Sequence, residues 1–180
     1  SAALARRNHF SGVKNVLVSM GGSDSANKTL EALKVLAGLS AASRLGVTVV
    51  IGPQYAHDDA SLAEVADNFD SLDILRGVSD MAELMLESDL AIGAAGTTSW
   101  ERCCLGLPAL VYVAADNQRE AALSLETAGA IRCWNSAAGL KRHLEEFMDN
   151  ASLYRSAVAA AFDVCDGLGA ERVVSVMRSC

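Results

Sequence analysis

The sequence lacks the features that mark several large classes of protein. No apolar run approaches the roughly 18 residues that a membrane-spanning helix needs, and residues 1–11 are basic without an apolar segment. The five cysteines are odd in number and form no CxxC pair, so neither a disulfide framework nor a zinc site is expected, and a reducing cytoplasm fits better. With 15 basic against 22 acidic residues, the net charge is −7, which disfavours nucleic acid and anionic membranes as partners.

Common catalytic signatures are also missing. Neither the GxGxxG fingerprint of dinucleotide-binding folds nor the GxSxG turn that carries an esterase nucleophile occurs. Residues 22–29 resemble a phosphate-binding P-loop only in their Lys28-Thr29 ending, because Asn27 stands where that motif needs glycine. We therefore expect no cofactor and no metal ion.

The sequence does contain a regular alternation of apolar runs and amphipathic stretches. Nearly continuous apolar runs are typical of strands covered on both faces of a parallel sheet, and they occur at residues 15–20, 47–51, 72–75, 90–92, 109–113 and 130–134. Helix candidates lie near residues 28–39, 61–69, 81–87, 99–105 and 118–127, and residues 136–180 are expected to be helical, with a break at 166–169. The pattern predicts an α/β fold with a doubly wound, parallel, six-stranded Rossmann-like sheet.

Two glycine-rich turns that follow apolar strands are the strongest functional signal. The first comprises residues 20–24, with the sequence MGGSD, and the second comprises residues 93–101, with the sequence GAAGTTSWE. Unsatisfied backbone N–H groups and the positive end of a helix dipole at such a turn suit a phosphate. Ligands of doubly wound sheets lie beyond the carboxyl ends of the strands, where both turns are expected. Two such turns on one edge indicate a diphosphate.

Each of these signals has a structural alternative. Glycine turns often serve only as tight connections between a strand and a helix. Glu101 could accept hydrogen bonds from ribose hydroxyls, but its spacing from Thr98 also fits a capping box. Trp100, Cys103 and Cys104 share a face at helical spacing, which favours core packing over thiol chemistry.

Candidates for acid–base catalysis are few. His9 lies in the N-terminal arm, His143 in a helical segment and His57 in the loop of residues 53–59. We expect each to be a solvated surface residue rather than a general base. Only His57 is expected near the ligand edge, where it is a weak catalytic candidate. The chain thus looks like the ligand-binding half of an enzyme and lacks a general base of its own.

Several segments resemble the C-terminal half of the UDP-sugar hydrolase family of pseudaminic acid biosynthesis. They are residues 16–24 (VLVSMGGSD), 88–93 (SDLAIG), 96–108 (GTTSWERCCLGLP), 115–118 (ADNQ) and 166–172 (DGLGAER). The resemblance runs from about residue 13 to the C-terminus. Members of that family remove UDP from UDP-2,4-diacetamido-2,4,6-trideoxy-β-L-altropyranose. A broader similarity extends to the C-terminal domain of the GT-B glycosyltransferase that adds N-acetylglucosamine to lipid I in peptidoglycan synthesis.

The resemblance implies a ligand contact at each matched position. By ligand group, the implied contacts are Gly21, Gly22 and Ser23 for the diphosphate and the cleft between two domains, Gly96, Thr97, Thr98 and Ser99 for phosphate oxygens, Glu101 for the ribose hydroxyls, Val78, Ser79 and Met81 for uracil, and Asn117 and Gln118 for the sugar.

The family's catalytic histidine and most of its sugar pocket belong to an N-terminal half that is absent here. The resemblance therefore implies that residues 1–12 are a linker or arm from that half and that residues 13–180 form the nucleotide-sugar-binding domain. In the intact family, water attacks the anomeric carbon and UDP leaves with inversion, so the implied partners are UDP or a UDP-sugar and the N-terminal half. Two other interpretations stay open: the donor-binding domain of a GT-B glycosyltransferase, which uses a sugar acceptor instead of water, and a noncatalytic UDP-sugar-binding module.

Overall fold

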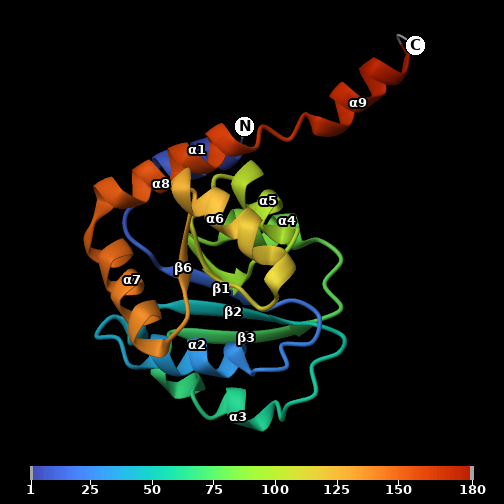
Figure 1. Cartoon of the computed structure of the whole chain (residues 1–180). Helices are drawn as coiled ribbons and strands as arrows, with labels where there is room; N and C mark the ends of the chain where they lie inside the picture. The colour runs from blue at the N-terminus through green and yellow to red at the C-terminus, as the bar shows by residue number, and fades with distance from the viewer. Residues whose placement is uncertain (1, 179–180) are drawn as a thin grey trace.

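The computed structural model describes residues 2–178 and contains one parallel sheet flanked by helices (Figure 1). The strands are β1 (Asn15–Ser19), β2 (Gly46–Ile51), β3 (Ser71–Arg76), β4 (Leu90–Ala94), β5 (Ala109–Tyr112) and β6 (Ile131–Trp134). The α-helices are α1 (Ala2–Asn8), α2 (Lys28–Ala37), α3 (Ala60–Ala63), α4 (Met81–Glu87), α5 (Thr98–Cys104), α6 (Arg119–Thr127), α7 (Ala137–Asp149), α8 (Ala151–Val164) and α9 (Gly169–Arg178), and the 3-10 helices are η1 (Ala42–Arg44), η2 (Ala66–Asn68) and η3 (Asp116–Gln118). The strand order is β3-β2-β1-β4-β5-β6 with all pairs parallel, which confirms the predicted doubly wound sheet.

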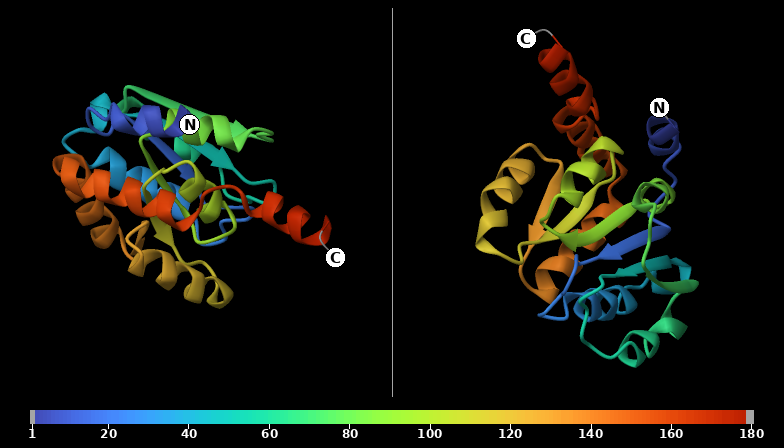
Figure 2. Two further views of the ribbon diagram at one scale, coloured as in Figure 1. Left: turned by 90° about the horizontal axis from the view of Figure 1, so that it is seen from above. Right: turned by 90° about the vertical axis from the view of Figure 1, so that its right-hand side faces the viewer.

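The central strands are buried on both faces of the sheet. Along β1, Val16 and Val18 belong to one hydrophobic cluster, whereas Leu17 between them belongs to the other. The first cluster includes side chains of α2 and α7, and the second includes side chains of α4, α5 and α6, so these helices cover opposite faces (Figures 1 and 2). Because both faces are covered, each strand needs apolar residues at successive positions, and the sequence shows continuous runs.

The structure interrupts two of the predicted helical segments. The single helix expected over residues 61–69 is wrong, because the chain forms the short pieces α3 and η2 instead. Asn68 ends this segment by donating from its side chain to the Val65 carbonyl at 2.9 Å, a local bond that competes with helix continuation. In the C-terminal third, Asn150 separates α7 from α8 and accepts from the Leu153 N–H at 2.9 Å, which caps α8.

The last helix, α9, extends away from the rest of the molecule (Figures 1 and 2). It begins at Gly169, so the predicted break at residues 166–169 is confirmed. Its apolar side chains include Val173 and Met177, which are 59% and 72% exposed. Within the part of the chain that the structure describes, no helix has both the length and the apolar character needed to cross a membrane.

Residues 2–8, which fall within the expected arm, form helix α1 and pack on the body through Arg7. This side chain is 2% exposed, and burial lowers the pKa of its guanidinium. Its Nη2 donates to the Met85 carbonyl at 2.9 Å, its Nε donates to the Leu105 carbonyl at 3.3 Å, and its Nη1 donates to the Ser88 carbonyl. Arg7 thereby satisfies carbonyls at the end of α4, where a helix leaves acceptors unpaired.

We expect Arg7→Met to lower the free energy of unfolding by roughly 2 kcal/mol or more, because it leaves several buried carbonyls without a donor. Arg6→Met is the matched control, since Arg6 is exposed, pairs with the half-buried Asp89 at 3.1 Å and donates to the Glu87 carbonyl. That pair should contribute less than about 1 kcal/mol. Urea unfolding of both variants measures the difference. Equal midpoints would contradict a role for Arg7 in holding α1.

Candidate functional site

The sheet has its topological switch point between β1 and β4. β1 pairs with β4 on one side and with β2 on the other, so the connections that leave β1 and β4 run in opposite directions. Ser19, at the end of β1, is in register with Gly93 near the end of β4. Ligands of open α/β sheets bind in the crevice at this place. The prediction that both glycine-rich turns lie on one sheet edge is therefore confirmed, and the structure makes them neighbours.

The first turn is immobilised by the loop that follows β2. Gly21 has a φ of +84°, and residues 21–23 are exposed. Gly52 packs so closely on this turn that a Cβ atom at its position would lie 2.2 Å from the Gly21 carbonyl oxygen. The Gln54 N–H donates to the Gly22 carbonyl at 2.9 Å. The turn is thus accessible to a ligand while its backbone is held in place.

Asp24 closes the start of helix α2, which follows the first turn. Its carboxylate accepts from the N–H groups of Lys28 and Thr29, both at 2.8 Å. A protein carboxylate therefore occupies the position at which this helix could hold an anion. The N–H groups of Gly21, Gly22 and Ser23 have no acceptor among residues 2–178. A phosphate at the first turn would meet these turn amides rather than the helix end.

The second turn leads from β4 into α5. The N–H groups of Gly96, Thr97 and Thr98 have no protein acceptor in the described part of the chain. α5 has no side-chain cap, so the capping-box alternative for Glu101 is not formed. Glu101 is exposed on this helix. Its carboxylate is therefore accessible beside the turn.

The buried face of α5 differs from the one expected. It is formed by Ser99, Arg102 and Cys103, whereas Trp100 is 43% exposed. The prediction that Trp100 packs in the core is therefore wrong. Its spacing of three residues from Cys103 fits a common helical face, but the buried face is centred on the other side of Cys103, toward Ser99.

Of the residues implied for uracil, Met81 lies near the switch point although β3 is an edge strand. Val78 is half-buried and Ser79 is exposed in the connection from β3 to α4. Asp80 caps α4 by accepting from the Glu83 N–H at 3.0 Å. Met81 lines a small cavity together with Ser19, Thr98 and Arg102, among others. The structure therefore brings this connection to the ends of β1 and β4.

The residues implied for the sugar follow β5, the next strand beyond β4. Asn117 and Gln118 lie in η3. Asn117 is exposed, and the Gln118 side-chain oxygen accepts from the Ala114 N–H at 3.1 Å. Both residues are on the same edge of the sheet as the two glycine turns.

The histidines supply no group placed as a general base at the turns. His57 Nε2 donates to the Asp24 carbonyl at 2.9 Å, and its ring packs edge-on against Tyr55 with centroids 5.0 Å apart. His57 thus lies near the edge of the sheet that carries the two turns, as expected, and stabilises the end of the first turn at Asp24. His9 Nδ1 contacts the Ala5 carbonyl, and His143 contacts Glu146. Within the described residues, no three His, Cys, Asp or Glu side chains are placed to hold a metal ion.

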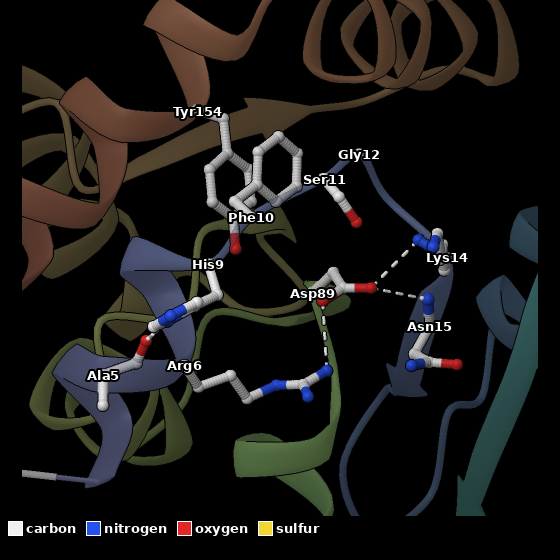
Figure 3. A pocket seen from close by; sticks show the side chains of 10 residues that line it. All are labelled: Ala5, Arg6, His9, Phe10, Ser11, Gly12, Lys14, Asn15, Asp89 and Tyr154. Carbon is white, nitrogen blue, oxygen red and sulfur yellow. Dashed lines mark hydrogen bonds and ion pairs between the residues drawn. The ribbon is translucent and has the colours of Figure 1, made fainter.

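A cavity of about 590 Å³ lies at the opposite edge of the sheet, where β1 and β4 begin (Figure 3). Asp89 is at its centre and accepts from the backbone N–H groups of Lys14 and Asn15, both at 2.9 Å, and from Arg6 at 3.1 Å. This cavity is separate from the switch point. Its lining includes Arg6 and Lys14, but the carboxylate of Asp89 already accepts from Arg6.

Arg102 is a site residue that the sequence analysis missed. It is 2% exposed, and its Nη2 donates to the Ala94 carbonyl at 3.1 Å and to Thr98 Oγ1 at 2.9 Å. Burial lowers its pKa to about 10, so the guanidinium is still charged at neutral pH. The sequence offers no signal for its burial, because the helical spacing of Trp100 and Cys103 indicates a different buried face.

Known structures share the fold of this chain. MurG of Acinetobacter baumannii superposes with a TM-score of 0.78 at 24% identity, over 99% of this chain and 53% of that one. A UDP-GlcNAc 2-epimerase from Neisseria meningitidis, solved with UDP-GlcNAc bound, gives a TM-score of 0.69 at 12% identity, over 99% of this chain and 47% of that one. The chain therefore spans about half the length of these structures, and its fold is that of a GT-B C-terminal domain.

Sequence comparison identifies the family. An uncharacterized protein of Methanocaldococcus jannaschii is 36% identical over 109 residues, which make up 59% of this chain and 22% of that protein. The model of the glycosyltransferase family 28 C-terminal domain matches residues 16–162, which is most of the chain. The chain therefore belongs to the glycosyltransferase family 28 C-terminal domain family.

Proposed function

We propose that the chain is the UDP-binding half of a nucleotide-sugar hydrolase that releases UDP and a free 2,4-diacetamido-2,4,6-trideoxy sugar. The observation that carries the proposal is the meeting of two glycine-rich turns with free amides at the switch point, beside the exposed carboxylate of Glu101. The UDP-GlcNAc bound to the structurally similar epimerase supports a nucleotide sugar as the ligand class. The resemblance of residues 96–108 to the hydrolase family supports the reaction.

In this proposal the chain stabilises the leaving group. The amides of Gly21, Gly22, Gly96 and Thr97 face the departing diphosphate, and Glu101 accepts hydrogen bonds from the ribose hydroxyls. Fixed N–H dipoles at the place where negative charge develops lower the barrier to C–O cleavage. The N-terminal half supplies the base that activates water, since the Nε2 of His57 is bonded to the Asp24 carbonyl.

The second candidate function is the donor-binding domain of a GT-B glycosyltransferase. The family match and the structural similarity to MurG favour it. This function uses the same nucleotide site, but a sugar hydroxyl replaces water as the nucleophile. The two candidates therefore differ in whether release of UDP requires an acceptor.

We expect UDP to bind the chain at least about tenfold more tightly than ADP or GDP, because a site that hydrogen-bonds one base leaves polar groups unpaired with another. Isothermal titration calorimetry with the three nucleotides measures the preference. Equal affinity for all three would contradict the assignment of uridine and leave only a diphosphate site.

A further inference from the structure

Arg102 is a buried cation without an acidic partner. No Asp or Glu side chain among residues 2–178 forms a hydrogen bond or ion pair with it, and its Nη1 is buried without a partner. A buried charge is costly unless a counter-charge or several hydrogen bonds compensate it. The burial of this guanidinium is therefore not explained by packing alone, because its charge still needs a compensating negative group.

The guanidinium lies directly beneath the second glycine turn. A Cβ atom at Gly93 would be 2.8 Å from Arg102 Nη2, so the side chain fills the space that this glycine leaves open. Arg102 also lines a cavity of about 10 Å³ that Ser19 and Thr98 share. Arg102 therefore lies beside the ends of both β1 and β4.

The bond to Thr98 determines what that hydroxyl can do. Because Arg102 Nη2 donates to Thr98 Oγ1, the threonine oxygen acts as an acceptor toward the arginine. Its own O–H hydrogen is left to donate elsewhere. No group among residues 2–178 accepts a hydrogen bond from that O–H. A hydroxyl polarised by a neighbouring cation donates more strongly to an anion.

We propose that Arg102 is a positioning residue that turns the Thr98 hydroxyl into a hydrogen-bond donor for the diphosphate of the bound nucleotide, whose negative charge compensates the buried guanidinium. This inference rests on the proposed function. Arg102 acts through Thr98 and through the Ala94 carbonyl, which it holds at the end of β4. Its contribution grows with the negative charge of the ligand, so it favours a diphosphate over an uncharged nucleoside.

The test compares UDP with uridine. In Arg102→Met, UDP affinity should fall roughly ten- to a hundredfold, as for the loss of a hydrogen bond to a charged group, while uridine affinity changes by less than about twofold. Thr98→Val should show the same selective loss of UDP affinity. The double variant should lose little more affinity than either single variant, because both substitutions remove the same Arg102–Thr98 interaction. Arg102→Lys, which keeps the charge, should lie between wild type and Arg102→Met.

The matched control is Arg172→Met, which removes an exposed arginine from α9 and should leave both affinities unchanged. Equal weakening of UDP and uridine in Arg102→Met and Thr98→Val would mean that Arg102 only supports the fold, and the inference would be overturned. If Arg102→Met fails to fold, the UDP-to-uridine ratio in Thr98→Val and Arg102→Lys decides the same question. A wild-type chain that binds no UDP would contradict the proposed function itself, whereas binding that no variant alters overturns only the role of Arg102.

Discussion

Replacing Glu101 by alanine is expected to weaken UDP binding by roughly ten- to over a hundredfold, the range for losing a hydrogen bond from a charged group. Glu101→Gln should weaken it less, because the amide oxygen still accepts one hydrogen bond from the ribose. The carboxylate is exposed beside the second turn, and no capping interaction holds it. Calorimetric titration with UDP measures both variants.

The control for this prediction is Glu171→Ala. Glu171 is an exposed glutamate in the first turn of α9, so it matches Glu101 in residue type and helix position but lies outside the site. Both alanine variants should unfold within about 0.5 kcal/mol of wild type, as is usual for exposed positions. A Glu101→Ala variant that loses stability and keeps its UDP affinity would assign Glu101 to the helix instead of the ribose.

The second large effect concerns turnover. If the proposed function holds, residues 1–180 alone should release UDP from the altrose-configured UDP-sugar roughly 10²–10⁴-fold more slowly than the chain combined with the proposed N-terminal half, because positioned acid–base catalysis contributes about this factor. The half can be added covalently or in trans. Release of UDP in water identifies the hydrolase, and release that depends on a sugar acceptor identifies the transferase.

His57→Ala is the informative variant in that assay. His57 supports the chain at Asp24 through a 2.9 Å hydrogen bond, so we expect its removal to leave the rate of the combined halves within about threefold of wild type, well below the effect of losing a general base. If the chain alone releases UDP rapidly and His57→Ala abolishes that release, the proposal that the N-terminal half supplies the base would be contradicted. His57 would then be the base.

The sheet and the common edge of its two glycine turns could be predicted because they depend on patterns that the sequence displays directly. Val16, Leu17 and Val18 form a continuous apolar run, as a strand with two covered faces requires. The glycine turns follow such runs, and parallel strands end at one edge. Strand order was not encoded in this way, so only the structure shows that the two turns are neighbours across β1 and β4.

Features that depend on packing between distant segments could not be predicted. Arg7 and Arg102 are charged residues that the sequence analysis did not identify as buried, and their burial depends on carbonyls and hydroxyls supplied by other elements. The helical spacing of Trp100 and Cys103 predicts a common buried face, but the direction from which the sheet approaches α5 decides which side is covered. The need for glycine at position 52 likewise arises only because the loop after β2 packs closely against the first turn.

The measurement that tests the central claim most directly is a titration of the ¹⁵N-labelled chain with UDP, followed by amide chemical shifts. The account predicts the largest shifts at Gly21, Gly22, Gly96 and Thr97, the amides that have no acceptor in the described chain. The cavity around Asp89 at the opposite edge should show little change. Shifts concentrated between Arg6 and Asn15, with the two glycine turns unaffected, would contradict a nucleotide site at the switch point.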